Sequence, residues 1–158
     1  FVVLPDERFD TQPLVEDQLV AVLPKGHPLA QRKTLDLSDL RPLPFIMTAA
    51  GATAHVERLF ESAGLRLNVQ HRYSQILTII KTVESGAGVS IVASLALSDQ
   101  VMAMCPGVVK KPLSQPAKRS VGLAVPNLKQ ASPAVHAFLK TAKGLVPKLR
   151  QDLAPRWA

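Results

Sequence analysis

Metal-dependent chemistry would need histidine, cysteine or acidic side chains at short, regular spacings, and the sequence does not supply them. The four histidines do not recur at the spacings of metal ligands: His27, His55, His71 and His136. His55-Val56-Glu57 matches one half of a zinc-deaminase signature, but no Pro-Cys-x-x-Cys follows it. Cys105 is the single cysteine, and it precedes Pro106 without a partner cysteine. We therefore expect no metal site.

The sequence also lacks complete motifs for a catalytic nucleophile or for phosphate binding. Ser94 is not part of a Gly-x-Ser-x-Gly elbow. No Gly-Lys-Ser/Thr phosphate loop occurs. The acid pairs Asp6-Glu7 and Glu16-Asp17 fall in a predicted loop and at a strand edge, where solvated charge is ordinary. The sequence therefore predicts no catalytic residue and no cofactor, and an enzyme is only the third function class.

The pair of glycines at Gly86 and Gly88 could suggest a dinucleotide fingerprint, but the surrounding pattern argues against it. Ser74 is a candidate N-cap for a helix whose apolar residues recur at helical spacing: Ile76, Ile79, Ile80 and Val83. A buried strand is predicted over 89–92, after the glycines. Dinucleotide sites place the strand before the glycines. We interpret this stretch as a helix, a turn with a C-capping Gly86, and a strand.

Strands and helices alternate along the chain, which favours parallel strand pairing and an α/β fold. The predicted strands cover residues 1–4, 14–23, 45–48, 67–73, 89–92, 108–113 and 120–125. The predicted helices cover a short turn that ends at residue 40, residues 54–63, and residues 95–104. Another helix is predicted from Gln75, after the Ser74 cap, to just before Gly86, and Ser132 caps a last helix. The apolar face of the last helix is expected to contain Val135, Phe138, Leu139, Ala142 and Val146, with Gly144 and Pro147 weakening its end.

Composition and charge limit the function classes. The chain has 158 residues, 47% of them hydrophobic, which fits a folded protein with one good core or two small lobes. No apolar run approaches eighteen residues, so we expect no membrane span. The net charge is +7; up to Glu84 there are 9 basic and 10 acidic residues, and after it 10 and 2. With only 4% aromatic residues, a solvated basic surface is favoured over direct nucleic-acid binding, which stays open.

Four short signatures occur in one order and resemble the effector-binding domain of LysR-type transcriptional regulators. Gly26-His27-Pro28-Leu29-Ala30 follows an apolar strand, and Leu35-Asp36-Leu37-Ser38-Asp39-Leu40 precedes Pro44-Phe45-Ile46. The third signature is Val56 to Leu65, and the fourth runs from Ile79 to Val92. Each signature is weak alone, but the ordered set covers nearly the whole chain.

The resemblance implies a type 2 periplasmic-binding-protein-like α/β fold, with one complete Rossmann-like lobe and part of a second. It assigns residues 1–18 to lobe I, residues 19–125 to lobe II, and residues 126–158 to a return to lobe I and a tail. It also implies an effector cleft between the lobes. The rest of lobe I, a winged helix-turn-helix domain and a linker helix are expected on the N-terminal side.

The implied function is effector sensing in a cytoplasmic bacterial regulator, with promoter DNA contacted only through the winged helix-turn-helix domain. A homodimer or tetramer is implied, with the helix over 54–63 contributing Arg58 and Glu61 near the rim of the contact. The implied partners are a small, anionic effector and a second copy of the chain, and no membrane. The alternative function is a solute-binding protein of a transport system.

The resemblance and the positions of the helix starts suggest where the effector binds. The candidate residues are Thr48, Ala49, Gly51, Ala52, Thr53, Ser74, Gln75, Ile76 and Ala93. Small residues before Thr53 leave room for a ligand, and helix N-termini favour anions. Thr53 is either a cap or a ligand contact, and for Ser74 the cap is favoured. At Ala54-His55, family members often carry an arginine, so a fixed carboxylate clamp is in doubt.

Overall fold

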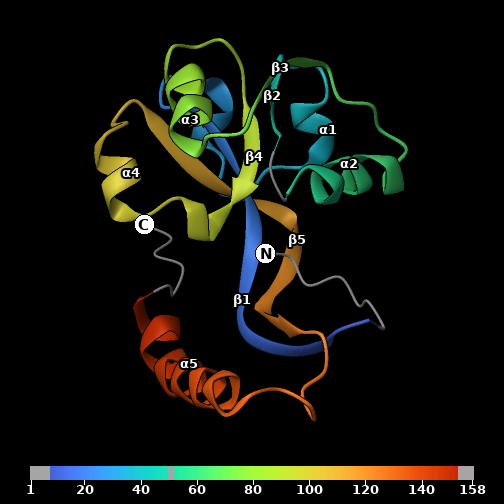
Figure 1. Cartoon of the computed structure of the whole chain (residues 1–158). Helices are drawn as coiled ribbons and strands as arrows, with labels where there is room; N and C mark the ends of the chain where they lie inside the picture. The colour runs from blue at the N-terminus through green and yellow to red at the C-terminus, as the bar shows by residue number, and fades with distance from the viewer. Residues whose placement is uncertain (1–7, 50–51, 153–158) are drawn as a thin grey trace. The chain divides into compact units, whose positions relative to one another are not determined.

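The computed structural model describes residues 8–49 and 52–152, and the chain divides into two compact units. Unit 1 contains the residues up to Asp17 and from Lys118 on, and unit 2 runs from Gln18 to Ala117. The strands β1 (Asp10–Pro24) and β5 (Val108–Val125) pass through both units, and Figure 1 shows the two long strands. The strand predicted over residues 1–4 lies outside the described residues.

Unit 2 alternates strands and helices, which confirms the predicted α/β class. Between β1 and β5 its elements are η1 (Pro28–Gln31), α1 (Leu37–Leu40), β2 (Phe45–Thr48), α2 (Thr53–Ser62), β3 (Val69–Tyr73), α3 (Ile76–Glu84), β4 (Ser90–Ala93), η2 (Ser94–Ala96) and α4 (Asp99–Ala103). β2 coincides with its prediction, and α2 and α3 lie within one residue of theirs.

The strands of unit 2 combine parallel and antiparallel pairing. β2 and β3 pair in parallel, and β1 lies between β4 and β5. β2 and β4 are also neighbours, because the Ile46 amide donates to the Val89 carbonyl at 2.8 Å and Phe45 forms a parallel bridge with Val89. β1 is antiparallel to β4, with Leu19 opposite Ala93. The strands β3, β2 and β4 therefore end at the same edge.

The core of unit 2 lies on both faces of these strands. One cluster contains Leu19, Ala21 and Leu23 of β1, together with Phe45 and residues of α2, and the Phe45 and Phe60 rings meet edge to face at 6.0 Å. The other cluster contains Val20 and Val22 with the apolar stripe of α3: Ile79, Ile80 and Val83. Because both faces of β1 are covered, its buried half reads as a continuous apolar run from Leu19 to Leu23.

The turn after α3 has the glycine conformations that the sequence predicts. Gly86 adopts φ +83° directly after the helix, and Gly88 adopts φ +156°. A Cβ atom on Gly88 would lie 2.4 Å from the Pro44 carbonyl oxygen. The two glycines therefore form a turn, as predicted, and Gly88 also allows a close backbone approach that the sequence did not predict.

The helix predicted over 95–104 is wrong in its first half. Residues Ser94–Ala96 form a 3₁₀ turn, and α4 begins only at Asp99. The Ser98 hydroxyl accepts the Val101 amide at 3.3 Å and so caps a new helix. The stretch predicted as one helix is therefore divided by this cap.

The two strands predicted over 108–113 and 120–125 are one strand, β5. Residues around Leu35 provide the missing partners, because the Leu35 amide donates to the Pro112 carbonyl at 3.0 Å and the Ser114 amide donates to the Leu35 carbonyl at 2.9 Å. A proline lacks only its own N–H, and its carbonyl still accepts. The strand therefore continues through Pro112 and Pro116.

Unit 1 contains the outer halves of β1 and β5 and the helix α5 (Pro133–Asp152). The Ser132 hydroxyl accepts the Val135 amide at 3.4 Å, with Pro133 in the first helical position, so the predicted cap is confirmed. One expectation is wrong, because the Phe138 side chain is 61% exposed. α5 continues through Pro147, which removes a single helical donor.

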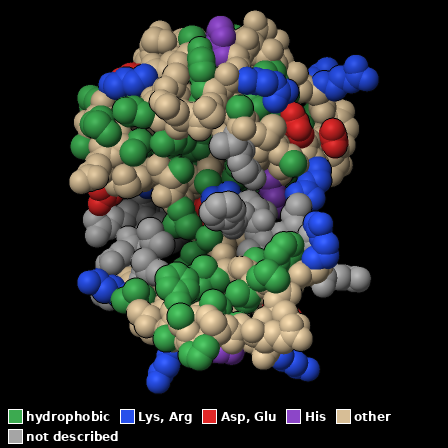
Figure 2. Space-filling view, viewed as in Figure 1, with side chains coloured by type: hydrophobic (Ala, Val, Ile, Leu, Met, Phe, Trp, Pro, Cys, Tyr) green, Lys and Arg blue, Asp and Glu red, His purple; other side chains and the backbone are tan. Residues whose placement is uncertain are grey.

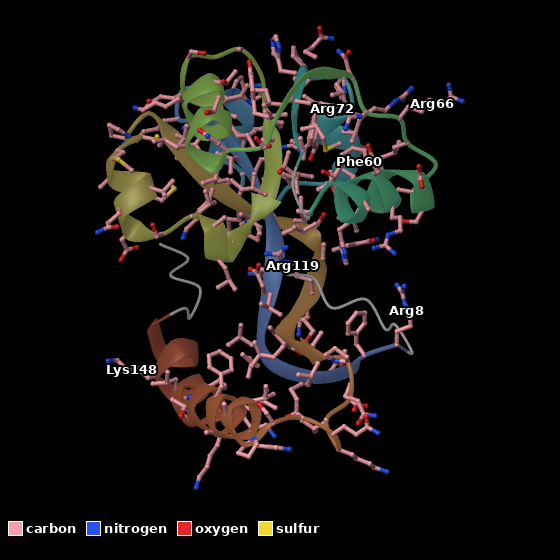
Figure 3. All side chains as sticks on the ribbon, viewed as in Figure 1. Arg8, Phe60, Arg66, Arg72, Arg119 and Lys148 are labelled. Carbon is pink, nitrogen blue, oxygen red and sulfur yellow. The ribbon has the colours of Figure 1, made fainter. Side chains whose placement is uncertain are left out.

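Charged side chains are dispersed over the face of the molecule drawn in Figure 2. On the face that Figure 2 shows, Lys and Arg side chains are separated from one another by other groups. Figure 3 labels Arg119 beside β1 and β5, where its guanidinium binds Asp17. No helix among the described residues is long and apolar enough to cross a membrane. The drawn face therefore has no continuous basic surface of the kind that direct nucleic-acid binding would need.

Candidate functional site

The carboxyl ends of three neighbouring strands of unit 2 lie at one edge, which we name the site edge. β2 ends at Thr48, β3 at Tyr73 and β4 at Ala93. In open α/β sheets, ligands bind outside the carboxyl ends of the strands. Eight of the nine residues predicted from the sequence lie at or next to these strand ends, and Gly51 lies outside the described residues.

The loop after β2 is closed at its base by two hydrogen bonds. The Ala49 amide donates to the Tyr73 carbonyl at 2.7 Å, and the Thr53 hydroxyl donates to the Thr48 carbonyl at 2.5 Å. Thr48 is buried, whereas Ala49 is exposed. The Ala49 amide thus extends the strand pairing and is already bonded, so it is not a free donor for an anion.

Thr53 is not the N-cap of α2, contrary to one of the two alternatives in the sequence. The N-cap is Ala52, which has no side chain to cap with, and Thr53 is the first helical residue. The Ala52 carbonyl accepts the amides of His55 and Val56 at 3.1 and 3.0 Å. The Thr53 hydroxyl turns back to Thr48 instead, because the loop brings that carbonyl within reach of the first turn.

Ser74 is also not an N-cap. The N-cap of α3 is Gln75, with φ −98° and ψ 126°, and its side chain makes no capping hydrogen bond. The side chains of Ser74 and Gln75 are exposed, and Ile76 is half-buried. The helix begins one residue later than the serine predicts, and the exposed polar groups of Ser74 and Gln75 stay beside the start of α3.

The third strand end supplies a small, buried side chain. Ala93 is 7% exposed and lies opposite Leu19, where β1 enters unit 2. The chain then turns at once into Ser94–Ala96. A methyl group at this position restricts the site edge less than a larger side chain would.

Two helices of unit 2 begin at this edge, and that determines its chemistry. The first turn of a helix contains amide N–H groups that the helix itself does not bond, and these favour an anion. α2 has 10 residues and α3 has 9. Within the described residues, no group of three or more His, Cys, Asp or Glu side chains could hold a metal ion. The arrangement suits recognition of a small anion.

Charged groups close to the start of α2 are already engaged. The Arg58 Nε atom donates to the Ala54 carbonyl at 3.1 Å, and its Nη2 atom lies 3.4 Å from His55 Nδ1. Arg72 and Glu57 form an exposed ion pair at 3.2 Å. At Ala54-His55, where related regulators often carry an arginine, this helix has none. The nearby Arg58 is bonded to its own helix.

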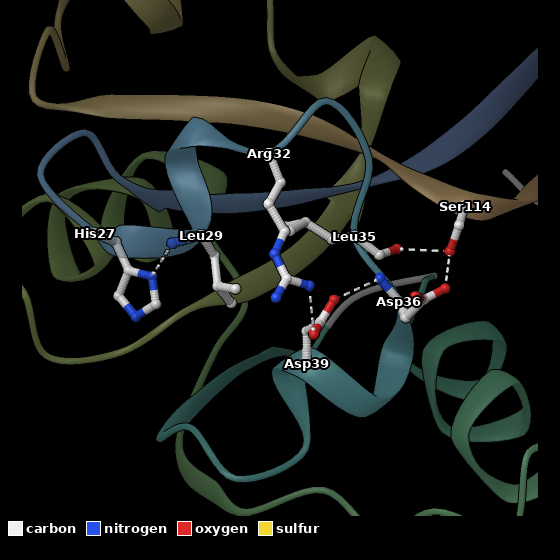
Figure 4. A network of polar contacts seen from close by, with 7 residues as sticks. All are labelled: His27, Leu29, Arg32, Leu35, Asp36, Asp39 and Ser114. Atoms are coloured by element: carbon white, nitrogen blue, oxygen red, sulfur yellow. Dashed lines mark hydrogen bonds and ion pairs between the residues drawn. The ribbon is translucent and has the colours of Figure 1, made fainter.

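A contrasting polar cluster lies in the segment from residue 25 to residue 39, which runs from the end of β1 into α1 (Figure 4). The His27 Nδ1 atom accepts the Leu29 amide at 3.2 Å, and Asp39 accepts both Arg32 Nη1 at 2.8 Å and the Asp36 amide at 3.0 Å. The Ser114 hydroxyl binds Asp36 and the Leu35 carbonyl. In these contacts the polar groups of the cluster bond to one another and to the nearby backbone.

Two perturbed pKa values belong to a contact at the C-terminal end of α3. Lys81 Nζ lies 2.7 Å from Glu84 Oε2, and the Gly107 amide donates to Glu84 Oε1 at 2.8 Å. The hydrogen bond to Glu84 raises the pKa of Lys81, and the hydrogen bonds from Lys81 and Gly107 lower the pKa of Glu84. These groups hold a loop to α3 and are not part of the site edge.

Comparisons with known proteins agree on one family. The model of the LysR substrate-binding domain matches residues 2–146. The HTH-type transcriptional regulator YvbU of Bacillus subtilis, itself uncharacterised, is 32% identical over 144 residues, which cover 91% of this chain and 49% of that protein. The chain thus spans about half the length of this relative.

Solved structures share the fold. The CcmR regulatory domain of Synechocystis PCC6803, in complex with 2-PG, has a TM-score of 0.82 and 22% identity, over 92% of this chain and 71% of that chain. The effector-binding domain of QuiR, in complex with shikimate, has a TM-score of 0.78 and 23% identity, over 92% and 69%. At these identities, the two likenesses establish the fold.

Proposed function

Because the chain belongs to the LysR substrate-binding domain family, we propose that it senses a small effector for a DNA-binding transcriptional regulator. The observation that carries this proposal is the site edge, where the ends of β2, β3 and β4 meet the starts of α2 and α3. Catalysis is not part of the proposal, since the matched curated relatives are transcriptional regulators.

The proposed binding residues are those at the site edge, together with the loop residue outside the described part: Thr48, Ala49, Gly51, Ala52, Thr53, Ser74, Gln75, Ile76 and Ala93. Backbone amides at the helix starts and the exposed groups of Ser74 and Gln75 would hold an anionic group. The apolar contacts would come from Ile76 and the alanines. The structures with 2-PG and shikimate support a small molecule as the class of ligand.

The proposed partners follow from the relatives, which are named as HTH-type regulators. The effector signal would pass to a helix-turn-helix domain on the same polypeptide, which binds promoter DNA in the cytoplasm. Self-association would use α2, with Arg58 and Glu61 near the rim of the contact. Nothing in the comparisons supports the alternative of a transport solute-binding protein.

A thermal-shift screen of small carboxylates and phosphate esters, including shikimate and 2-PG, tests the ligand class. A ligand at about 100 times its dissociation constant adds roughly 2.7 kcal/mol to the free energy of unfolding. We expect the stabilising compounds to be anions. Stabilisation by uncharged or cationic compounds alone would contradict the proposal.

Two matched variants test the place of binding. Ala49→Asp puts a carboxylate on an exposed position of the site edge, and Gly26→Asp puts the same charge in an open turn of the 25–39 segment. A like charge near the bound anion should weaken binding about tenfold in Ala49→Asp. Calorimetric titration with the best compound of the screen should show unchanged affinity in Gly26→Asp. Equal affinities in the two variants would place the ligand elsewhere.

A further inference from the structure

Within unit 2, β2 is paired along its whole length with β3 but only in part with β4. On the β3 side, the pairing reaches the last residue of the strand, where Thr48 lies opposite Tyr73. On the β4 side, the backbone hydrogen bonds among the described residues run from the Val89 amide to the Pro44 carbonyl at 2.9 Å and from the Ile46 amide to the Val89 carbonyl at 2.8 Å. The pairing of β2 with β4 therefore stops before β2 ends.

A side chain takes the place of the next bond between these two strands. In a parallel ladder, that bond would run from the Ile91 amide to the Ile46 carbonyl. Instead, the Ser90 hydroxyl donates to this carbonyl at 2.7 Å. Ser90 and Ile46 are both 0% exposed, so the contact lies away from bulk water. A serine hydroxyl that binds a backbone carbonyl is an alternative to the ladder of a sheet, and Ser90 thus replaces a backbone bond at this point.

Beyond Ser90, the two strands follow different partners. β4 continues against β1, where Ala93 lies opposite Leu19. β2 continues against β3, where Thr48 lies opposite Tyr73. Thr48 and Ala93 are the last residues of their strands, and both are proposed binding residues. The point at which the pairing stops therefore decides how these two residues are spaced at the site edge.

We propose that Ser90 is a positioning residue of the site edge: its hydroxyl ends the pairing of β2 with β4 and so sets the spacing of Thr48 and Ala93. Ser90 itself is fully buried and does not touch the effector in this scheme. The role rests on the proposed function, because it concerns the affinity of the site edge for a small molecule. A spacing that is fixed in advance avoids the cost of moving the strands when the ligand binds.

Ser90→Ala tests the effect on strand pairing in the full chain without effector. Loss of the hydroxyl leaves the Ile46 carbonyl without its donor, and a buried carbonyl without a partner is costly. We therefore expect the Ile91 amide to bind this carbonyl and to extend the pairing of β2 with β4. NMR detects the contact as a scalar coupling across the hydrogen bond, between the Ile91 amide nitrogen and the Ile46 carbonyl carbon. The coupling should be absent in the parent protein and present in Ser90→Ala.

Calorimetric titration tests the effect on binding. The titrant is the carboxylate or phosphate ester that stabilises the parent protein most in the thermal-shift screen. We expect its dissociation constant to rise about tenfold in Ser90→Ala, because the ends of β2 and β4 are drawn together. Ser90→Thr keeps the hydroxyl and suits a strand, so it should retain the parental affinity and show no Ile91 coupling.

Val22→Ala is the matched control for a loss of stability. Val22 is 0% exposed and lies opposite Ser90 on β1, on the side of β4 that faces away from β2. The truncation should lower the melting temperature, because it leaves a cavity in the core. The dissociation constant should stay within about twofold of the parental value, and the Ile91 coupling should stay absent.

The two measurements separate the ways in which the proposal can fail. An Ile91 coupling in the parent protein, or none in Ser90→Ala, would show that Ser90 does not end the pairing. Parental affinity in Ser90→Ala, or an equal loss in Val22→Ala, would show that the spacing does not affect binding. A parent protein that no compound of the screen stabilises would contradict the proposed function and with it the role of Ser90 in binding, whereas the coupling would still decide its role in the pairing.

Discussion

Two connecting segments of unit 2 use their polar groups in opposite ways. In the segment 25–39, charged and hydroxyl side chains bind one another and the backbone, as in the contacts of Asp39 with Arg32 and with the Asp36 amide. The loop after β2 contains small residues and leads into α2, and α3 begins after β3 at the same site edge. Internal pairing makes the first segment a structural device, whereas the second leaves helix N-termini for a ligand.

If this contrast is right, changes at the site edge alter ligand affinity, and changes in segment 25–39 alter stability alone. The largest effect is expected at Thr53. Thr53→Val removes the hydroxyl that donates to the Thr48 carbonyl, so the free energy of unfolding should fall by about 1 kcal/mol. The hydroxyl has a single hydrogen. If that hydrogen turns from the Thr48 carbonyl to an anionic effector on binding, the dissociation constant of Thr53→Val should rise by roughly 10- to 150-fold, measured by calorimetric titration.

Thr53→Ser is the control, because it keeps the hydroxyl and removes only a methyl group. We expect its affinity and stability to stay close to those of the parent protein. Equal dissociation constants for Thr53→Val and the parent protein would limit Thr53 to closing the loop.

The next effect is expected in the 25–39 segment. Asp39→Ala removes the acceptor of the Asp36 amide at the start of α1 and the partner of Arg32. The free energy of unfolding should fall by about 1–2 kcal/mol in urea denaturation, with ligand affinity unchanged. Arg32→Ala removes only an exposed ion pair and should cost less than about 1 kcal/mol. A weaker ligand affinity in Asp39→Ala would contradict the prediction that changes in segment 25–39 alter stability alone.

The smallest effect is expected at Glu84, which extends the contrast to a third loop. The pKa of Glu84 is lowered in the folded state, so its contribution to stability is present above the ordinary pKa of 4.5 and is lost as the pH falls through the folded-state pKa. Glu84→Gln should therefore lower the melting temperature at pH 7, and the difference should shrink at pH 3. A difference that does not change with pH would show that the charge is not involved.

Local patterns predict the elements better than they predict the places where elements meet. The stripe of Ile79, Ile80 and Val83 is buried as its spacing predicts, because helical period and one-sided burial are properties of a short window. Phe138 fits the same kind of pattern in α5 and is exposed. Periodicity identifies an apolar face, but the neighbours that cover it come from distant parts of the chain.

The candidate site shows the same limit. The sequence locates small residues and two helix starts, and all of them that the structure describes lie at the site edge. It does not predict that Ala52 and Gln75 are the N-caps, or that the Thr53 hydroxyl turns to Thr48. A capping serine or threonine is recognised by type, whereas the partner of its hydroxyl depends on how the preceding loop closes.

By itself, the sequence determined the α/β alternation, the glycine turn at Gly86 and Gly88, the cap at Ser132 and the family, because these depend on residue types within short windows. Only the tertiary structure decided that β5 continues through two prolines, since its partner Leu35 lies far away in sequence. It also decided that Asp17 and Arg119, 102 residues apart, form a buried pair. Residue charge and apolar spacing are properties of short stretches of sequence. The burial and the partners that set the energy of an interaction depend on how distant parts of the chain fold together.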